Sequence, residues 1–211
     1  MDYQPLIALS KGHNQHAQGA EQDGVTEFSL IEPVVDLVKK QFEDWGIRHL
    51  LYVPKLDHLS MAELLADSGK RKELAATIKF INQRNVKVAV ELHFNKHRNK
   101  DVHGCEVFHY RQSVEGERLA KFVSGRLTEW LPPSVVKDDT QTYIYERYGY
   151  PLGFLKYTKM PAILIEGGYM SNSKDFSQMK DNPDKLARVL SEALVGILEK
   201  FLGVDCNLKP S

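Results

Sequence analysis

Two short and almost wholly apolar runs each carry an ionisable residue at or near their end, and this pattern constrains the fold more than any other feature of the chain. The first run is Val88–Asn95, which contains His93, and the second is Pro161–Glu166. Such runs are typical of strands that are buried on both faces of a parallel sheet. Because open α/β sheets bind ligands beyond the carboxyl ends of their strands, we expect His93 and Glu166 to lie at a ligand site.

Strand-like and helix-like segments alternate along the chain, which predicts an α/β domain with a mostly parallel sheet. A capping box at Ser29–Glu32 starts the first helix and Gly46 ends it, whereas Gly69 interrupts the second helical region. Residues 135–159 match no regular pattern. The predicted strands are residues 5–10, 49–53, 86–92, 104–110 and 161–166, and the predicted helices are residues 29–45, 60–81, 114–131 and 183–202.

The composition and the N-terminal sequence bear on the expected partners and on the expected location of the protein. A length of 211 residues suits one domain, and 28 basic residues balance 28 acidic ones, so there is no electrostatic reason to expect nucleic acid or an anionic membrane as a partner. The N-terminus has neither the basic start nor the apolar length of a signal peptide, and no run is long enough to span a membrane. We therefore expect the protein to be made and kept in the cytoplasm until it is released.

Two further ionisable residues, His13 and Glu27, precede or begin the first predicted helix. Taken singly, His13 could be a solvated loop histidine, and Glu27 could be a carboxylate that the helix dipole favours. Together with His93 and Glu166, however, they supply what a zinc hydrolase needs. Such an enzyme has three protein ligands, one open position for water and a carboxylate that moves protons. We therefore expect one Zn²⁺ per chain.

Other polar residues near the apolar runs have less specific interpretations. Alternation along the strand places Glu91 on the same face as His93, where it could hydrogen-bond the far ring nitrogen and fix the tautomer. It could equally pair with a nearby cation. His16 is a possible rival to His13 as a ligand. His97 follows His93 at the spacing of a helical zinc motif, but the chain there leaves a strand, so we set it aside.

Several segments of the chain carry a resemblance that covers about residues 6–202. They are Ser10–Asn14, Gly24–Phe28, Glu91–Asn95, Gly104–Phe108 and Met160–Asn172. In this order they resemble the zinc-dependent N-acetylmuramoyl-L-alanine amidases of the Amidase_3 type. The chain departs from the family at its first motif, which usually reads Asp-Pro-Gly-His-Gly-Gly. It also departs at Glu91, where the family often has Ser.

The resemblance implies that His13, Glu27 and His93 are zinc ligands and that Glu166 is the catalytic carboxylate. Glu91 remains a candidate for a residue that supports the metal site. It implies a single three-layer α/β domain, with a twisted, mostly parallel sheet and helices on both faces. The implied reaction is hydrolysis of the amide between N-acetylmuramic acid and the L-alanine of the peptidoglycan stem peptide. We expect one catalytic domain over residues 1–211, with a core of about residues 6–202 and no separate module that binds the cell wall.

The expected biological role is that of a bacteriolytic phage or prophage endolysin, which reaches the cell wall after a holin opens the membrane. A phage tail amidase, or an amidase that acts when a mother cell lyses, would have the same sequence features. Two rival functions stay open: a zinc exopeptidase that acts on ordinary peptides, and a non-catalytic module that binds peptidoglycan. A preference for muropeptides would distinguish the amidase from the first rival, and turnover would distinguish it from the second.

Overall fold

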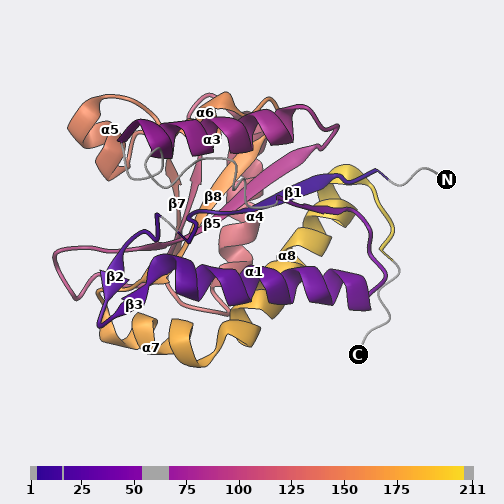
Figure 1. Cartoon of the computed structure of the whole chain (residues 1–211). Coiled ribbons are helices and arrows are strands. Elements are labelled where there is room, and N and C mark those ends of the chain that lie inside the picture. The colour runs from indigo at the N-terminus through magenta and orange to yellow at the C-terminus, as the bar shows by residue number, and fades with distance from the viewer. Residues whose placement is uncertain (1–3, 16, 54–66, 207–211) are drawn as a thin grey trace.

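The computed structural model describes residues 4–15, 17–53 and 67–206, and it places one six-stranded sheet between two layers of helices (Figure 1). The strand order is β4-β1-β5-β8-β6-β7. The strands are β1 (Ile7–Lys11), β4 (Leu50–Tyr52), β5 (Val88–Asn95), β6 (Cys105–His109), β7 (Ser134–Asp138) and β8 (Ala162–Tyr169). A separate antiparallel hairpin of β2 (Glu21–Gln22) and β3 (Val25–Thr26) precedes the first helix. The expected three-layer α/β fold is confirmed.

The sheet is mostly parallel, as predicted, but its last two strands are reversed. Strands β4, β1, β5 and β8 run in one direction, whereas β6 pairs with β8 antiparallel and β7 pairs with β6 parallel. The start of β6 therefore meets the ends of β5 and β8. In the register of the sheet, Glu166 lies between His93 on one side and Glu106 on the other.

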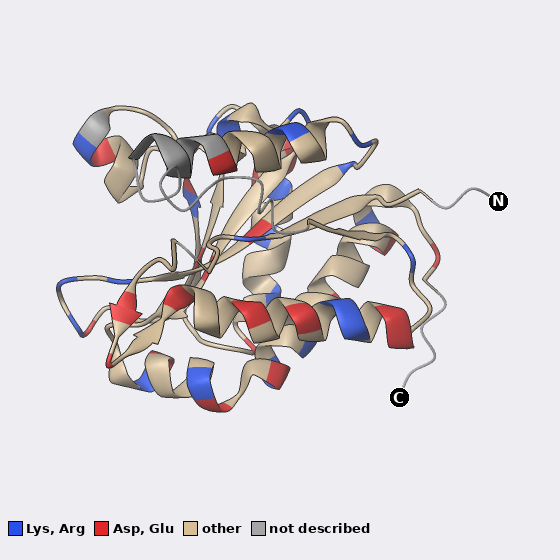
Figure 2. Ribbon diagram, in the orientation of Figure 1, with Lys and Arg blue, Asp and Glu red and all other residues tan. Residues whose placement is uncertain are grey.

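Helices cover both faces of the sheet (Figure 1 and Figure 2). The larger apolar core lies between the sheet and helices α1, α4 and α8, and a smaller core lies beneath α3 and α6. The helices are α1 (Glu27–Asp44), α3 (Asp67–Asn82), α4 (Val114–Leu127), α5 (Tyr143–Tyr148), α6 (Gly153–Tyr157), α7 (Ser173–Asp181) and α8 (Pro183–Leu202). None of the helices in the described part of the chain combines the length and apolarity that crossing a membrane would need.

The first helix begins earlier than the sequence pattern predicts. The residue that caps α1 is Thr26, whose hydroxyl oxygen accepts a hydrogen bond from the backbone N–H of Ser29 at 3.3 Å. The prediction of a capping box at Ser29–Glu32 is therefore wrong, because Thr26 already supplies the side-chain oxygen that an N-cap needs. As a consequence, Glu27 is the first helical residue, and its side chain lies near the carboxyl ends of β1 and β5.

Three further local features differ from what the sequence pattern predicts. Gly69 does not interrupt a helix, since it lies inside α3, and the proposed start of that helix at residues 60–66 lies outside the described residues. Helix α7 follows the last strand and was not predicted. Residues 135–159 contain most of β7 together with α5 and α6. In contrast, α8 spans the predicted residues and ends before Gly203, which adopts a left-handed conformation with φ of 67°.

A buried carboxylate fastens the end of β8 to the start of β6. Oδ2 of Asp175 accepts hydrogen bonds from the backbone N–H groups of Gly104 at 2.8 Å and Tyr169 at 3.0 Å. Gly104 has a positive φ of 91°, and a Cβ atom there would lie 2.3 Å from the carbonyl oxygen of Pro133. Only glycine meets both demands. These contacts fix the position of Glu106, two residues farther along the chain.

Candidate metal centre and active site

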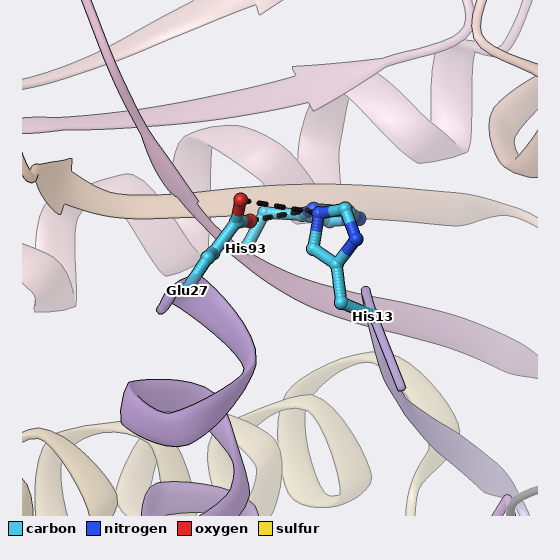
Figure 3. Close-up of side chains that lie close together, drawn as sticks. All are labelled: His13, Glu27 and His93. Atoms are coloured by element: carbon cyan, nitrogen blue, oxygen red, sulfur yellow. Dashed lines mark hydrogen bonds and ion pairs between the residues drawn. The ribbon is translucent and has the colours of Figure 1, made fainter. Parts of the chain in front are cut away.

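Three of the four residues that the sequence singled out lie close together near the carboxyl ends of β1 and β5 (Figure 3). His13 follows β1, Glu27 begins α1, and His93 lies on β5. Oε2 of Glu27 lies 3.1 Å from Nε2 of His13, and Oε1 lies 3.0 Å from Nδ1 of His93. One ligand atom from each residue lies within 4.8 Å of the other two. Residues 80 positions apart in the chain thus form a compact cluster of metal-ligand type.

The backbone holds Glu27 in place as firmly as the histidines do. Its carboxylate accepts hydrogen bonds from the backbone N–H groups of Ala20 and Phe94, each at 3.0 Å. Burial acts to raise the pKa of Glu27, but the hydrogen bonds and positive charge of His13 and His93 outweigh it and hold this pKa far below its usual value. Glu27 is therefore an anion fixed in one orientation, as a metal ligand should be.

Each imidazole has a second partner that orients its ring. Nδ1 of His13 lies 3.1 Å from the carbonyl oxygen of Ala17, and Nε2 of His93 lies 3.4 Å from a carboxylate oxygen of Glu91. A hydrogen bond at the far nitrogen fixes the tautomer and leaves the near nitrogen for a metal ion. Burial lowers the pKa of His93, but Glu27 and Glu91 together raise it well above its ordinary value. In this structure a proton can thus occupy the side of His93 that a metal ion would take.

Two glycines allow the backbone to approach the cluster closely. A Cβ atom on Gly12 would lie 2.2 Å from Cε1 of His93, and one on Gly19 would lie 2.4 Å from Oε2 of Glu27. Gly19 also has a positive φ of 77°. A side chain at either position would displace a ligand, so the spacing of the cluster depends on both glycines.

The donor set fits Zn²⁺. Two imidazole nitrogens and one carboxylate are a common set for a catalytic zinc ion, which keeps its fourth position for water or substrate. All three residues line one cavity of about 1730 Å³, so the fourth position would face open space. His97 is exposed and lies outside this cluster, and His16 is outside the described residues.

Glu166 lies beside the cluster without belonging to it. It pairs in register with His93 on the neighbouring strand, and it lines the same cavity. Its Oε2 atom is buried, and no group among the described residues donates a hydrogen bond to it. Burial raises the pKa of Glu166 to about 8; the charge of His93 opposes this rise, and the neighbouring carboxylates add to it. A carboxyl group with this pKa and a free oxygen can exchange protons near neutral pH.

A second carboxylate at this edge was missed by the sequence reasoning. Oε2 of Glu106 accepts a hydrogen bond from the side-chain amide of Asn95 at 3.1 Å, while Oε1 forms an ion pair with Lys137 of β7. The ion pair compensates the charge of Glu106, whereas Oε2 of Glu166 receives no hydrogen bond from the described residues. The available signal was a single Glu in a predicted strand, within the segment Gly104–Phe108 that carries part of the family resemblance.

The fold and the site define an α/β protein with a His–Glu–His cluster of metal-ligand type, and with a buried carboxylate of raised pKa beside it on the neighbouring strand. The family described as N-acetylmuramoyl-L-alanine amidase, Amidase_3, matches residues 7–197. The chain therefore belongs to this family, and its expected class, an amidase of peptidoglycan, is confirmed.

Several named proteins are similar to this chain in sequence or in fold. The chain is 25% identical to the germination-specific N-acetylmuramoyl-L-alanine amidase of Bacillus subtilis (strain 168) over 197 residues, which cover 93% of this chain and 79% of the relative. Its fold is similar to that of the CwlD amidase from Clostridioides difficile, solved in complex with the GerS lipoprotein, with a TM-score of 0.75 and 19% identity over 95% and 100% of the two chains. The catalytic domain of the CD27L endolysin, which targets Clostridia difficile, gives a TM-score of 0.67 and 21% identity over 91% and 97%.

Proposed function

We propose that this protein is a zinc-dependent N-acetylmuramoyl-L-alanine amidase, in which His13, Glu27 and His93 hold one Zn²⁺ and Glu166 is the catalytic carboxylate. The observation that carries the proposal is the convergence of the three ligand-type side chains next to a buried carboxylate oxygen to which no described residue donates a hydrogen bond. Family membership supports the bond that is cut, the amide between N-acetylmuramic acid and L-alanine.

Each of these residues has a distinct role in the proposed reaction. A zinc ion bound by the cluster would supply a Lewis acid and lower the pKa of a bound water molecule. Glu166 accepts a proton from the attacking water and returns it to the nitrogen of the leaving L-alanine. Glu27 and the two histidines keep their positions through contacts with Ala20, Phe94 and Ala17, and Glu91 holds the ring of His93.

Digestion of purified peptidoglycan, with mass analysis of the products, tests this function. We expect free stem peptides that begin with L-alanine, their loss when a chelator removes the metal, and their return when Zn²⁺ is added. Cleavage of free peptides in preference to muropeptides would favour the zinc exopeptidase, and binding without any new amine would favour the non-catalytic module. Either result would refute the amidase.

Replacement of Glu91 tests its support of the metal site. Gln keeps the size of the side chain but removes the negative charge that faces Nε2 of His93 at 3.4 Å. We expect Glu91→Gln to weaken Zn²⁺ binding by about 10–100-fold, the usual effect of losing such a partner. Competition with a chelating dye measures the affinity. An unchanged affinity would mean that Glu91 serves only as a buried charge partner.

The biological role is a separate question from the chemistry. The endolysin role, with its cytoplasmic synthesis and its need for a holin, stays a prediction, as does a single catalytic domain without a wall-binding module. The germination-specific relative in Bacillus subtilis favours a second candidate, an amidase that acts on the wall of a spore or its mother cell. Expression during phage lysis or during sporulation and germination would distinguish the two roles.

A further inference from the structure

Three exposed tyrosines line the cavity that also contains the His13–Glu27–His93 cluster. Tyr143 is 62% exposed, Tyr150 is 49% exposed and Tyr157 is 60% exposed, and all three line this cavity. The other large apolar side chains with high exposure in the described residues, Val114 and Val135, do not line it. We call these three residues the tyrosine wall. They belong to α5, to α6 and to the turn between these helices.

The segments that carry the tyrosine wall are held by specific hydrogen bonds. The side chain of Asn82 on α3 donates to the carbonyl oxygen of Tyr157 at 2.9 Å and accepts from the N–H of Lys159 at 2.8 Å. The hydroxyl of Thr142 caps α5 by accepting from the N–H of Tyr145 at 3.0 Å. These contacts fix the backbone on both sides of the cavity wall before any ligand binds.

Cations steady two of the rings while leaving them open to solvent. The guanidinium of Arg147 lies 5.5 Å from the ring centre of Tyr143, and the ammonium of Lys156 lies 5.1 Å from that of Tyr157. A cation over one face of a ring restricts its orientation. The exposure of both side chains shows that much of each ring still faces solvent, where a ligand could stack on it.

The chemistry of the wall matches sugar rings. A tyrosine offers an apolar ring face and a polar hydroxyl, and a pyranose offers a face of C–H groups and a rim of hydroxyls. The volume of about 1730 Å³ exceeds the roughly 300–1000 Å³ that suits a single drug-sized ligand. The amide that the proposed function cleaves joins a stem peptide to a glycan strand, so a cavity that holds this bond has to accommodate sugars as well as peptide.

We infer that Tyr143, Tyr150 and Tyr157 bind the glycan strand of peptidoglycan, by stacking on sugar units next to the muramoyl residue whose amide is cleaved. This inference rests on the proposed function. It assigns the tyrosine wall a role in substrate binding that is separate from the metal cluster and from Glu166. The wall then makes the enzyme prefer polymeric substrate to a single muramoyl peptide.

Kinetics on two substrates test the inference. The variant Tyr143→Ala/Tyr150→Ala/Tyr157→Ala is compared with the intact protein on long glycan strands that bear stem peptides and on N-acetylmuramoyl peptides with one sugar. We expect kcat/KM on the strands to fall by about tenfold or more, from the loss of three aromatic contacts, with little change on the single-sugar substrate. The triple Tyr→Phe variant keeps the rings and should keep most of the preference, and Val114→Ala is the control for an exposed apolar residue outside the cavity.

The outcomes separate a failure of the inference from a failure of the proposed function. If the intact protein cleaves neither substrate, the proposed function is wrong. If it cleaves both and the Ala variant has the same preference for strands, the tyrosine wall does not bind glycan. An equal loss on both substrates would assign the wall to the stem peptide instead. Titration of metal-free protein with a tetramer of N-acetylglucosamine, followed by tyrosine fluorescence, should show binding that the Ala variant loses, and its thermal unfolding establishes that the variant is folded.

Discussion

Replacement of Glu166 by Ala or Gln should abolish most of the amidase activity while leaving zinc binding intact. Glu166 lies beside the His13–Glu27–His93 cluster, and its buried Oε2 atom receives no hydrogen bond from the described residues. Removal of a general acid–base group lowers turnover by about 10²–10⁴-fold. We therefore expect at least a loss of roughly a hundredfold in the release of L-alanyl stem peptides, with one Zn²⁺ per chain retained in metal analysis.

The pH dependence sharpens this prediction. Burial raises the pKa of Glu166 to about 8 in the metal-free protein, and a bound cation would lower it again. Because the base has to be deprotonated to accept a proton, activity should fall as the pH drops through the pKa that Glu166 has in the metal-bound protein. The residual activity of Glu166→Gln should lack that dependence. Glu129→Gln, on the exposed surface after α4, is the control and should behave like the intact protein. Full activity in Glu166→Gln would remove this residue from the mechanism.

Replacement of Glu27 by Ala should have the second large effect, because it removes both a ligand and a structural acceptor. The carboxylate contacts both histidines and accepts hydrogen bonds from the backbone N–H groups of Ala20 and Phe94. We expect loss of stoichiometric zinc and of activity. The metal-free protein should also be less stable, since each buried donor left unpaired costs about 1–3 kcal/mol. Metal analysis and denaturant unfolding in the presence of a chelator measure the two effects separately.

A matched control for Glu27→Ala lies on the same helix. Glu43 is exposed near the end of α1 and forms only a surface ion pair with Lys39 at 3.8 Å. Exposed pairs of this kind contribute about 0–1 kcal/mol, so Glu43→Ala should keep its zinc, its activity and nearly all of its stability. A Glu27→Ala protein that binds zinc as tightly as the control would show that Glu27 is not a ligand.

Local patterns in the sequence predicted much of the fold. The apolar runs of β5 and β8 and the amphipathic pattern of α8 depend on neighbouring residues, and hydrophobic periodicity reports these directly. The same patterns predicted the wrong start for α1, where two nearby residues can each act as the N-cap. Thr26 and Ser29 can both cap a helix, and Thr26 does so here because it is the last residue of β3, where the hairpin passes directly into α1.

The sequence alone placed His93 and Glu166 at the ends of two buried strands, and the structure places them within β5 and β8, which continue to Asn95 and Tyr169. An ionisable group that closes an apolar run has few structural explanations, because burying a charge without a partner is costly. Their neighbours at the site were less well specified. His13 and Glu27 lie in a loop and at a helix start, where each has an ordinary interpretation by itself, and the resemblance to a family was needed to join them to the others.

Only the tertiary structure decided which further groups share the site. The reversal of β6 and β7 places Glu106 beside Glu166 and pairs it with Lys137, a residue from the stretch that had no predicted structure. Strand direction and order depend on pairings between segments that are distant in the chain, and a single strand has the same alternation in either direction. The tyrosine wall has the same origin, since the three exposed tyrosines line a common cavity only because α3, α5 and α6 pack around it.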